Sequence, residues 1–212
     1  MKLHWIKTHR LVRAFAPGML WKIPNVHKTV YLTFDDGPTP EITPWVMDQL
    51  RAYQAKATFF CIGKNVVAQP EICQQLKAEG HQVANHTQTH RNGWTTPPAS
   101  YLADFEQAKK YLYETIKEEV KLFRPPYGKI GLRAYFNLKK QGYKIVMWDV
   151  LSADFDPETT PQKCLDNVLN NLESGSIVVF HDSQKCFANL QYVLPKTLAF
   201  LKENEFCCEV IA

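Results

Sequence analysis

Short apolar runs alternate along this chain with longer segments in which apolar residues recur at helical spacing. The short runs predict seven buried strands, at residues 30–32, 57–62, 81–85, 122–124, 143–148, 176–180 and 206–211. The longer segments predict helices, at residues 40–53, 70–80, 99–119, 132–140, 160–172 and 190–201. Strands that alternate with helices indicate an α/β fold with a mainly parallel sheet, either open or rolled into a barrel. No repeat or linker interrupts the pattern, so we expect a single domain.

Polar side chains fall where the expected strands end. In folds of this kind, active sites form on the loops that follow the carboxyl ends of the strands. The polar residues at those positions are Asp35, Asp36, His86, His90, Arg124, Tyr127, Asp154 and His181. If the sheet closes, all of these side chains lie at the same mouth, which makes them the candidate site.

Two adjacent carboxylates, Asp35 and Asp36, follow the first apolar run, and Gly37-Pro38 ends the expected strand. Neighbouring acids repel each other, and a metal ion is the simplest compensation. It makes one carboxylate a ligand and leaves the other free for proton transfer. The alternative is a plain polar turn, because all four residue types are common in turns.

His86 and His90 are four residues apart, a spacing that stacks two imidazoles on one face of a helical turn and lets them share a metal. Two unrelated surface histidines would match the same pattern. With one aspartate added, the pair becomes a site of two histidines and one carboxylate. Such a site suits a divalent metal, zinc first, although cobalt, iron, nickel or manganese also fits.

Composition narrows the class of protein. A chain of 212 residues with 45% hydrophobic and 22% charged residues is typical of a globular protein. The net charge of +4 comes without a basic run, which argues against a nucleic-acid partner. The six cysteines form no CxxC pair, and we interpret them as small buried hydrophobic residues of a reduced protein.

The N-terminal segment, residues 1–27, mixes basic and apolar residues. It holds no apolar stretch of signal-peptide length and nothing long enough to span a bilayer, so we expect a cytoplasmic protein. Residues 1–22 fit two alternatives: an amphipathic helix on a membrane surface, or a cap packed against the domain formed by residues 28–212. The oligomeric state is not readable from the sequence.

Four segments carry a resemblance to a known family. They are TFDDGP at 33–38, HTQTH at 86–90, RPPYG at 124–128 and LESGSIVVFHD at 172–182. In this order and spacing they resemble the first, second, third and fifth motifs of the polysaccharide deacetylases, the NodB-homology domain of carbohydrate esterase family four. The resemblance runs from about residue 30 to the C-terminus. It implies a distorted seven-stranded (β/α) barrel, in agreement with the strand count.

The resemblance also implies roles at the first two motifs. Asp36, His86 and His90 would hold the metal, which lowers the pKa of a bound water molecule from about 16 to about 7. Asp35 would be the general base that takes the proton of that water, and Arg124 would be the charged partner that holds Asp35 in position. Taken singly, Arg124 also fits a helix cap.

Further roles follow for the later motifs. The backbone N–H of Tyr127 would stabilise the oxyanion, and His181 would be the general acid, with its ring oriented by Asp154. Taken singly, Asp154 also fits a turn cap and His181 a strand-end histidine. Trp94, Tyr127 and Phe155 would stack on sugar faces.

The fourth motif departs from the family pattern of an aspartate, two residues and Asp-Trp. Leu151 stands for the first aspartate and Phe155 for the tryptophan, while Asp154 is kept. This change concerns the groove wall and the fit of the substrate more than the chemistry.

The resemblance implies a metal-dependent hydrolase that removes N-acetyl groups from a sugar or glycan, with an acetylated carbohydrate as its partner. One alternative is an O-acetyl esterase, or a deacylase of a small or lipid-linked glycan, on the same scaffold. Another is a carbohydrate-binding protein without turnover. Against that alternative, every residue that the mechanism needs is present.

Overall fold

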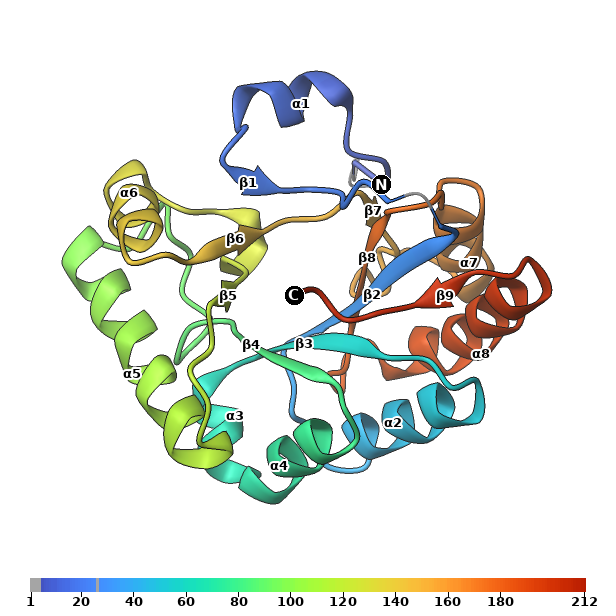
Figure 1. Ribbon diagram of the computed structural model, residues 1–212, viewed down its shortest axis with the longest axis horizontal. Helices are drawn as coiled ribbons and strands as arrows, with labels where there is room; N and C mark the ends of the chain where they lie inside the picture. Colours follow the sequence, from blue (N-terminus) through green and yellow to red (C-terminus); the bar gives the residue numbers. More distant parts are fainter. Residues whose placement is uncertain (1–4, 26) are drawn as a thin grey trace.

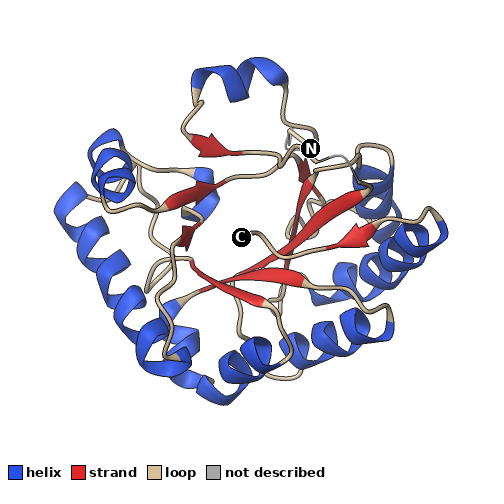
Figure 2. Ribbon diagram, viewed as in Figure 1, coloured by secondary structure: helices blue, strands red, loops and turns tan. Residues whose placement is uncertain are grey.

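Parallel strands curl around a central axis, and helices cover their outer face (Figure 1, Figure 2). The computed structural model describes residues 5–25 and 27–212. Neighbouring strands follow the order β1-β6-β5-β4-β3-β2-β8-β7, and β9 also pairs with β2. The strands are β1 (Met19–Leu20), β2 (Thr29–Asp35), β3 (Ala57–Cys61), β4 (Gln82–Asn85), β5 (Leu122–Phe123), β6 (Lys144–Val146), β7 (Val150–Leu151), β8 (Ile177–His181) and β9 (Cys207–Cys208).

The helices mostly connect successive parallel strands, as a parallel sheet requires. They are α1 (Arg10–Phe15), α2 (Ile42–Ala52), α3 (Gly63–Ala68), α4 (Pro70–Ala78), α5 (Pro98–Ile116), α6 (Leu132–Lys140), α7 (Pro161–Leu169), α8 (Phe187–Glu203) and the short 3₁₀ helix η1 (Pro126–Gly128). Thr160 caps α7 as expected, because its Oγ1 accepts a hydrogen bond from Lys163 N at 3.2 Å.

The α/β class is confirmed, and each expected strand and helix has a counterpart. The structure adds the helices α1, α3 and η1 and the strands β1 and β7 to the predicted set. The two strands have two residues each, too few to show a periodic pattern. The last strand is shorter than expected, because only Cys207 and Cys208 pair with β2 before the chain turns toward Thr58, whose Oγ1 accepts from Ile211 N.

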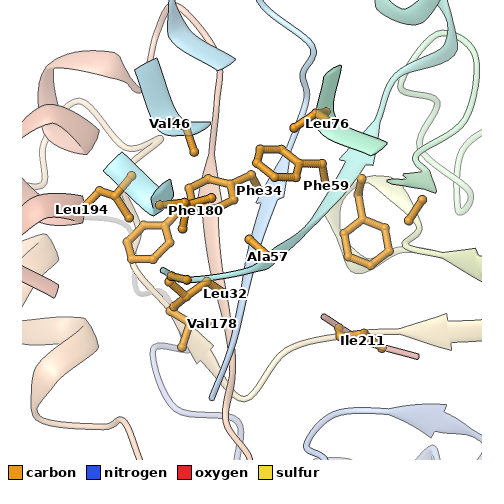
Figure 3. Packing of buried hydrophobic residues seen from close by; sticks show 14 of the residues in the cluster. Leu32, Phe34, Val46, Ala57, Phe59, Leu76, Val178, Phe180, Leu194 and Ile211 are labelled. Carbon is orange, nitrogen blue, oxygen red and sulfur yellow. The ribbon is translucent and has the colours of Figure 1, made fainter. Parts of the chain in front are cut away.

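The main core lies between the sheet and the helices. Phe34 of β2 stacks on Phe59 of β3, with ring centroids 5.0 Å apart, and on Phe180 of β8 at 5.7 Å. Figure 3 shows Val46 of α2 and Leu194 of α8 on the helix side of these rings. Burying each ring contributes about 2 kcal/mol, so the central strands are held by packing on their outer face.

The N-terminal segment lies across the gap between the two ends of the curled sheet (Figure 1). β1 pairs in parallel with β6, with Met19 opposite Ile145. Lys7 forms an antiparallel bridge with Val150 of β7. Residues 7–20 therefore bond to both sides of the gap.

Asp149, which is fully buried just before β7, binds basic side chains of the N-terminal segment. Its carboxylate accepts hydrogen bonds from Lys7 Nζ at 2.8 Å and from Ser176 Oγ at 2.6 Å, and it pairs with the guanidinium of Arg13. A buried carboxylate is costly unless it is paired, so these contacts favour a segment that packs against the barrel. The limits expected for the two parts, 1–27 and 28–212, stay predictions, and residues 1–4 and 26 lie outside the described ranges.

Across residues 5–25 and 27–212, no helix combines the length and the hydropathy that crossing a bilayer requires. All six cysteines are free. Cys61, Cys73, Cys164 and Cys186 are buried, Cys208 is half-buried and Cys207 is exposed. The interpretation as buried hydrophobic residues is thus right for four of them.

Candidate active site

β2 and β8 place Asp35 and His181 side by side at the carboxyl end of the sheet. The two residues are opposite each other in the parallel register of these strands, and Asp182 N donates to Asp35 O at 3.1 Å. The next residue along the chain, Asp36, leaves the strand with a φ of 81°. The two adjacent carboxylates consequently have different partners.

Asp35 is paired with a buried arginine. Arg124 is fully buried, and its Nη1 donates to Asp35 Oδ1 at 2.6 Å and to Thr33 Oγ1 at 2.8 Å. Its Nη2 donates to Met147 O at 2.9 Å, and the guanidinium lies 4.1 Å from the ring centroid of Phe60. A buried cation needs such partners, and together they hold the guanidinium and the Asp35 carboxylate in one orientation.

Asp36, His86 and His90 converge on one point. Asp36 Oδ1 lies 3.2 Å from His90 Nε2 and 3.7 Å from His86 Nε2, and this buried oxygen accepts no hydrogen bond. His86 Nδ1 donates to Arg124 O at 2.7 Å, which leaves Nε2 as the lone-pair nitrogen. Burial lowers the pKa of His86 to about 4, so its ring is neutral at physiological pH.

These three residues fit a divalent metal. An unbonded buried carboxylate oxygen beside two imidazole nitrogens is the donor set that a four-coordinate ion with an open position takes. Burial raises the pKa of Asp36, but the contact with His90 and the charges of His181 and His86 outweigh burial and hold that pKa below its ordinary value. Asp36 is thus an anion, as a ligand must be.

The histidines do not lie on a helical turn, and that expectation is wrong. Residues 86–90 form a loop after β4, with Thr87 and His90 in the left-handed region at φ of 65° and 58°. Asp104 of α5 accepts hydrogen bonds from Gln88 N at 2.9 Å and Thr89 N at 3.0 Å. Because Asp104 binds these N–H groups, the loop needs no helical hydrogen bonds, and the two imidazole rings still meet with centroids 5.0 Å apart.

Asp182 supports the turn after Asp36 and was missed by sequence reasoning. Its Oδ1 accepts from Gly37 N at 3.0 Å, and its Oδ2 accepts from Thr43 Oγ1 at 2.5 Å. A Cβ atom on Gly37 would lie 2.0 Å from Asp182 Oδ2, so only glycine fits there. On the other side, Asn65 of α3 donates to Asp36 O at 2.7 Å. The sequence offered one signal for Asp182, namely its position next to His181 in the fifth motif.

His181 is bonded to Asp154 twice. His181 Nδ1 donates to Asp154 Oδ1 at 2.8 Å, and His181 N donates to Asp154 Oδ2 at 2.8 Å. Burial alone lowers the pKa of His181, but the charge and hydrogen bond of Asp154, with the charges of Asp36 and Asp35, raise that pKa to about 9. The ring is therefore protonated at neutral pH, as a general acid must be.

Comparison with known proteins places these residues in a family. The sequence profile described as "Polysaccharide deacetylase" matches residues 22–146, more than half of the chain. The chain belongs to the polysaccharide deacetylase family. It is 36% identical over 190 residues to a peptidoglycan-N-acetylglucosamine deacetylase of Bacillus cereus, a match that covers 88% of this chain and 87% of the relative. A chitooligosaccharide deacetylase of Bradyrhizobium sp. is 36% identical over 156 residues, 73% of this chain and 71% of that relative.

A solved structure of a deacetylase confirms the distorted (β/α) barrel. The crystal structure of the Bc1960 peptidoglycan N-acetylglucosamine deacetylase, in complex with 4-naphthalen-1-yl-N-oxidanyl-benzamide, superposes with a TM-score of 0.88. The sequences are 27% identical, and the superposition covers 96% of this chain and 95% of that one. The resemblance in the four motifs is thus borne out at the level of the family and of the fold.

Of the three aromatic residues expected to contact a sugar, Tyr127 and Phe155 lie beside histidines of the site. Tyr127 is in the left-handed region, with a φ of 60°, and its exposed side chain brings Oη within 3.2 Å of His90 Nδ1. Trp94 is 69% exposed and lies under Lys129 Nζ, 5.2 Å from the ring centroid. The ring of Phe155 meets that of His181 edge to face at 5.2 Å.

The departure in the fourth motif leaves the contact between Asp154 and His181 intact. Leu151 is buried in β7 and its N donates to Ile6 O at 2.9 Å, so this position belongs to the packed wall of the barrel. Asp154, the aspartate that is kept, is the one that contacts His181. The chain therefore changes the residues around the pair and keeps the pair itself.

Proposed function

We propose that this protein is a metal-dependent N-deacetylase that hydrolyses the acetamido group of N-acetylglucosamine in a glycan. The observation that carries the proposal is the buried Asp36 Oδ1, which accepts no hydrogen bond and faces the Nε2 atoms of His86 and His90. The names of the two curated relatives support a peptidoglycan or chitin-type oligosaccharide as the substrate class.

Asp36, His86 and His90 would hold the metal, and zinc is the ion that we propose for this ligand set. When bound, the metal supplies activation of a water molecule and polarisation of the acetyl carbonyl. Asp35 accepts the proton of that water as the new C–O bond forms. Arg124 holds the Asp35 carboxylate in position, since it donates to Oδ1 from a fully buried position.

His181 completes the reaction as the general acid. The tetrahedral adduct of the acetyl group collapses when its C–N bond breaks, and the amine is a poor leaving group unless it gains a proton. His181 gives that proton to the nitrogen, while Asp154 keeps the imidazolium oriented through two hydrogen bonds. The backbone N–H of Tyr127 is our candidate for the oxyanion donor, and one such donor contributes about 3 kcal/mol.

Trp94, Tyr127 and Phe155 are our candidates for contact with the sugar rings. The rings of Tyr127 and Phe155 lie next to those of His90 and His181, and Trp94 is exposed. An aromatic face next to a polar group is the usual way to hold a pyranose, because its C–H groups are apolar and its hydroxyls are not. A membrane contact through residues 1–22 and a cytoplasmic location stay predictions.

The test is acetate release from chitin oligomers, peptidoglycan fragments and acetylated xylan, with metal analysis. We expect release from the N-acetylated glycans. At one equivalent of metal, Asp35→Asn should keep the metal at Asp36, His86 and His90 and lose most activity, whereas His86→Ala should lose both that site and the activity. Greater release from acetylated xylan would favour an O-acetyl esterase. If metal-loaded protein releases no acetate from any substrate but binds the glycans, the proposal is wrong and the carbohydrate-binding alternative holds.

A further inference from the structure

We propose that Asp154, His181 and Cys186 form a second metal site, which binds a thiophilic divalent cation such as zinc when metal exceeds the capacity of the first site. One ligand atom from each of these residues lies within 4.8 Å of the other two. Asp154 and Cys186 are buried and His181 is partly exposed. It shares no residue with Asp36, His86 and His90.

Burial and the charge of Asp154 raise the pKa of the Cys186 thiol, so its thiolate needs a cation beside it. Two local features would help that thiolate once a cation is bound. Cys186 is the residue just before α8, a helix of 17 residues, whose amino end stabilises a negative charge. Its Sγ accepts a hydrogen bond from Ser183 Oγ at 3.2 Å, which also stabilises the thiolate. The carboxylate of Asp154 is an unfavourable neighbour for a second anion. A cation between the two removes that repulsion and binds both.

Binding at this site releases protons. The Cys186 thiol loses its S–H proton, and the His181 imidazolium loses its Nδ1–H proton, which now lies between Nδ1 and Asp154 Oδ1. The ring keeps its Nε2–H. The first site fills first, because Asp36 Oδ1 accepts no hydrogen bond, whereas Asp154 Oδ1 must give up the one from His181 Nδ1.

A filled second site would stop the acid step, a consequence that rests on the proposed function. An imidazole that is bonded to a metal through Nδ1 holds its Nε2–H far more tightly than an imidazolium does. His181 then has no proton to give to the leaving amine. Hydrolysis of an activated ester, whose leaving group needs no proton, should be spared.

Cobalt titration tests the binding itself, since a cobalt–thiolate bond absorbs in the near ultraviolet. The background variant is Cys207→Ser/Cys208→Ser, because this adjacent pair is exposed and half-buried and would bind cobalt itself. We expect two equivalents of cobalt per chain, the second with the charge-transfer band. Cys186→Ser should lose the band and one equivalent. Cys164→Ser, which changes another buried thiol, is the matched control and should keep both.

One equivalent in the background variant, or a band that persists in Cys186→Ser, would overturn the proposal. Thermal unfolding followed by circular dichroism shows whether each variant is folded. His86→Ala removes the first site and should keep the band, so this arm does not depend on enzyme activity.

Excess zinc tests the consequence for turnover. We expect about 10²-fold slower amide hydrolysis relative to the same protein with one equivalent, and less than about a three-fold change for an activated ester. In Cys186→Ser, excess zinc should change both rates by less than about three-fold. Equal inhibition of Cys186→Ser would overturn the inhibitory role. If no acetate is released even with one equivalent, the proposed function fails, while the cobalt band still decides the second site.

Discussion

Two clusters at the mouth of the barrel use the same residue types and differ in what their carboxylates contact. In the metal cluster, Asp36, His86 and His90, the buried Asp36 Oδ1 accepts no hydrogen bond. In the acid pair, Asp154 and His181, both carboxylate oxygens accept one from His181. A carboxylate oxygen that accepts no hydrogen bond is the first available to a cation. A carboxylate whose two oxygens accept hydrogen bonds from a histidine favours the protonated form of that histidine.

The two buried histidines shift in opposite directions for this reason. His86 Nδ1 donates to a backbone carbonyl, a neutral acceptor, and burial lowers the pKa of the ring to about 4. Burial acts in the same direction on His181, but Asp154 is an anion and outweighs it, so that pKa rises to about 9. The partner of Nδ1 decides whether a buried imidazole is neutral or protonated in the metal-free protein.

The largest expected effect comes from removing the anion of the metal cluster. Asp36→Asn should weaken metal binding by more than about 100-fold, because even residues behind metal ligands are worth 10–100-fold. Deacetylation should fall by about 10³-fold or more, since water activation and oxyanion stabilisation are lost together. Metal content by mass spectrometry and acetate release measure both. A variant that binds the first equivalent of metal as tightly as the unmodified protein does would contradict the division between the clusters.

Removing the anion of the acid pair should leave the metal in place. Asp154→Asn should slow amide hydrolysis by about 10²-fold or more and bring the pKa of His181 from about 9 to its ordinary 6.5 or below. NMR titration of the metal-free protein measures this pKa. Asp156→Asn, two residues further along the same loop, is the matched control and should leave it high.

Stability gives a second measure of the same pair. The pKa of folded His181 is raised above its unfolded value, so the protonated ring stabilises the fold fully below about pH 6.5, and this contribution is lost as pH rises through about 9. In Asp154→Asn, denaturant unfolding should lack this loss. An unchanged pH dependence of the unfolding free energy would show that the pair is not coupled in this way.

Local patterns were enough to find the groups that carry charge in both clusters. Asp36, His86 and His181 follow apolar runs directly, and the carboxyl ends of parallel strands meet at one edge. The residues that hydrogen-bond to the loops around these groups come from remote elements, and no spacing in the sequence predicts them. Asp104 lies inside α5, and Asp182 acts on a turn 145 residues earlier.

The missed elements have a similar cause. α3 begins directly after β3 and holds Val66 and Val67, β-branched residues that weaken a helical signal. β1 has two residues and pairs with β6 across the closing gap of the sheet, a contact that depends on the finished barrel. Helix or strand type followed from the pattern only where the element was long enough to repeat it.

A smaller effect on metal affinity is expected at His90, whose Nδ1 contacts a side chain, whereas Nδ1 of His86 contacts the backbone. Tyr127→Phe removes the acceptor at 3.2 Å from His90 Nδ1 and should weaken metal binding by about ten-fold, with little change in kcat once metal is saturating. His86 has no equivalent variant, because its acceptor is the backbone of Arg124. Metal competition with a chelating dye gives the affinity. Tyr113→Phe, an exposed tyrosine on α5, is the control, and equal affinities of the two variants would exclude the orienting role.

The smallest effect should have the opposite sign. Lys185 is 61% exposed at its side chain, and its Nζ lies 3.7 Å from Asp36 Oδ2, so it competes with a metal for the charge of that carboxylate. Lys185→Gln should tighten metal binding by about three-fold at low salt, and by less as salt screens the repulsion. Lys196→Gln, on the exposed surface of α8, is the control and should change neither the metal affinity nor its salt dependence. The acid pair would be unaffected, because its carboxylate is already satisfied by His181. Weaker metal binding in Lys185→Gln would mean that the lysine helps to orient Asp36 more than it repels the ion.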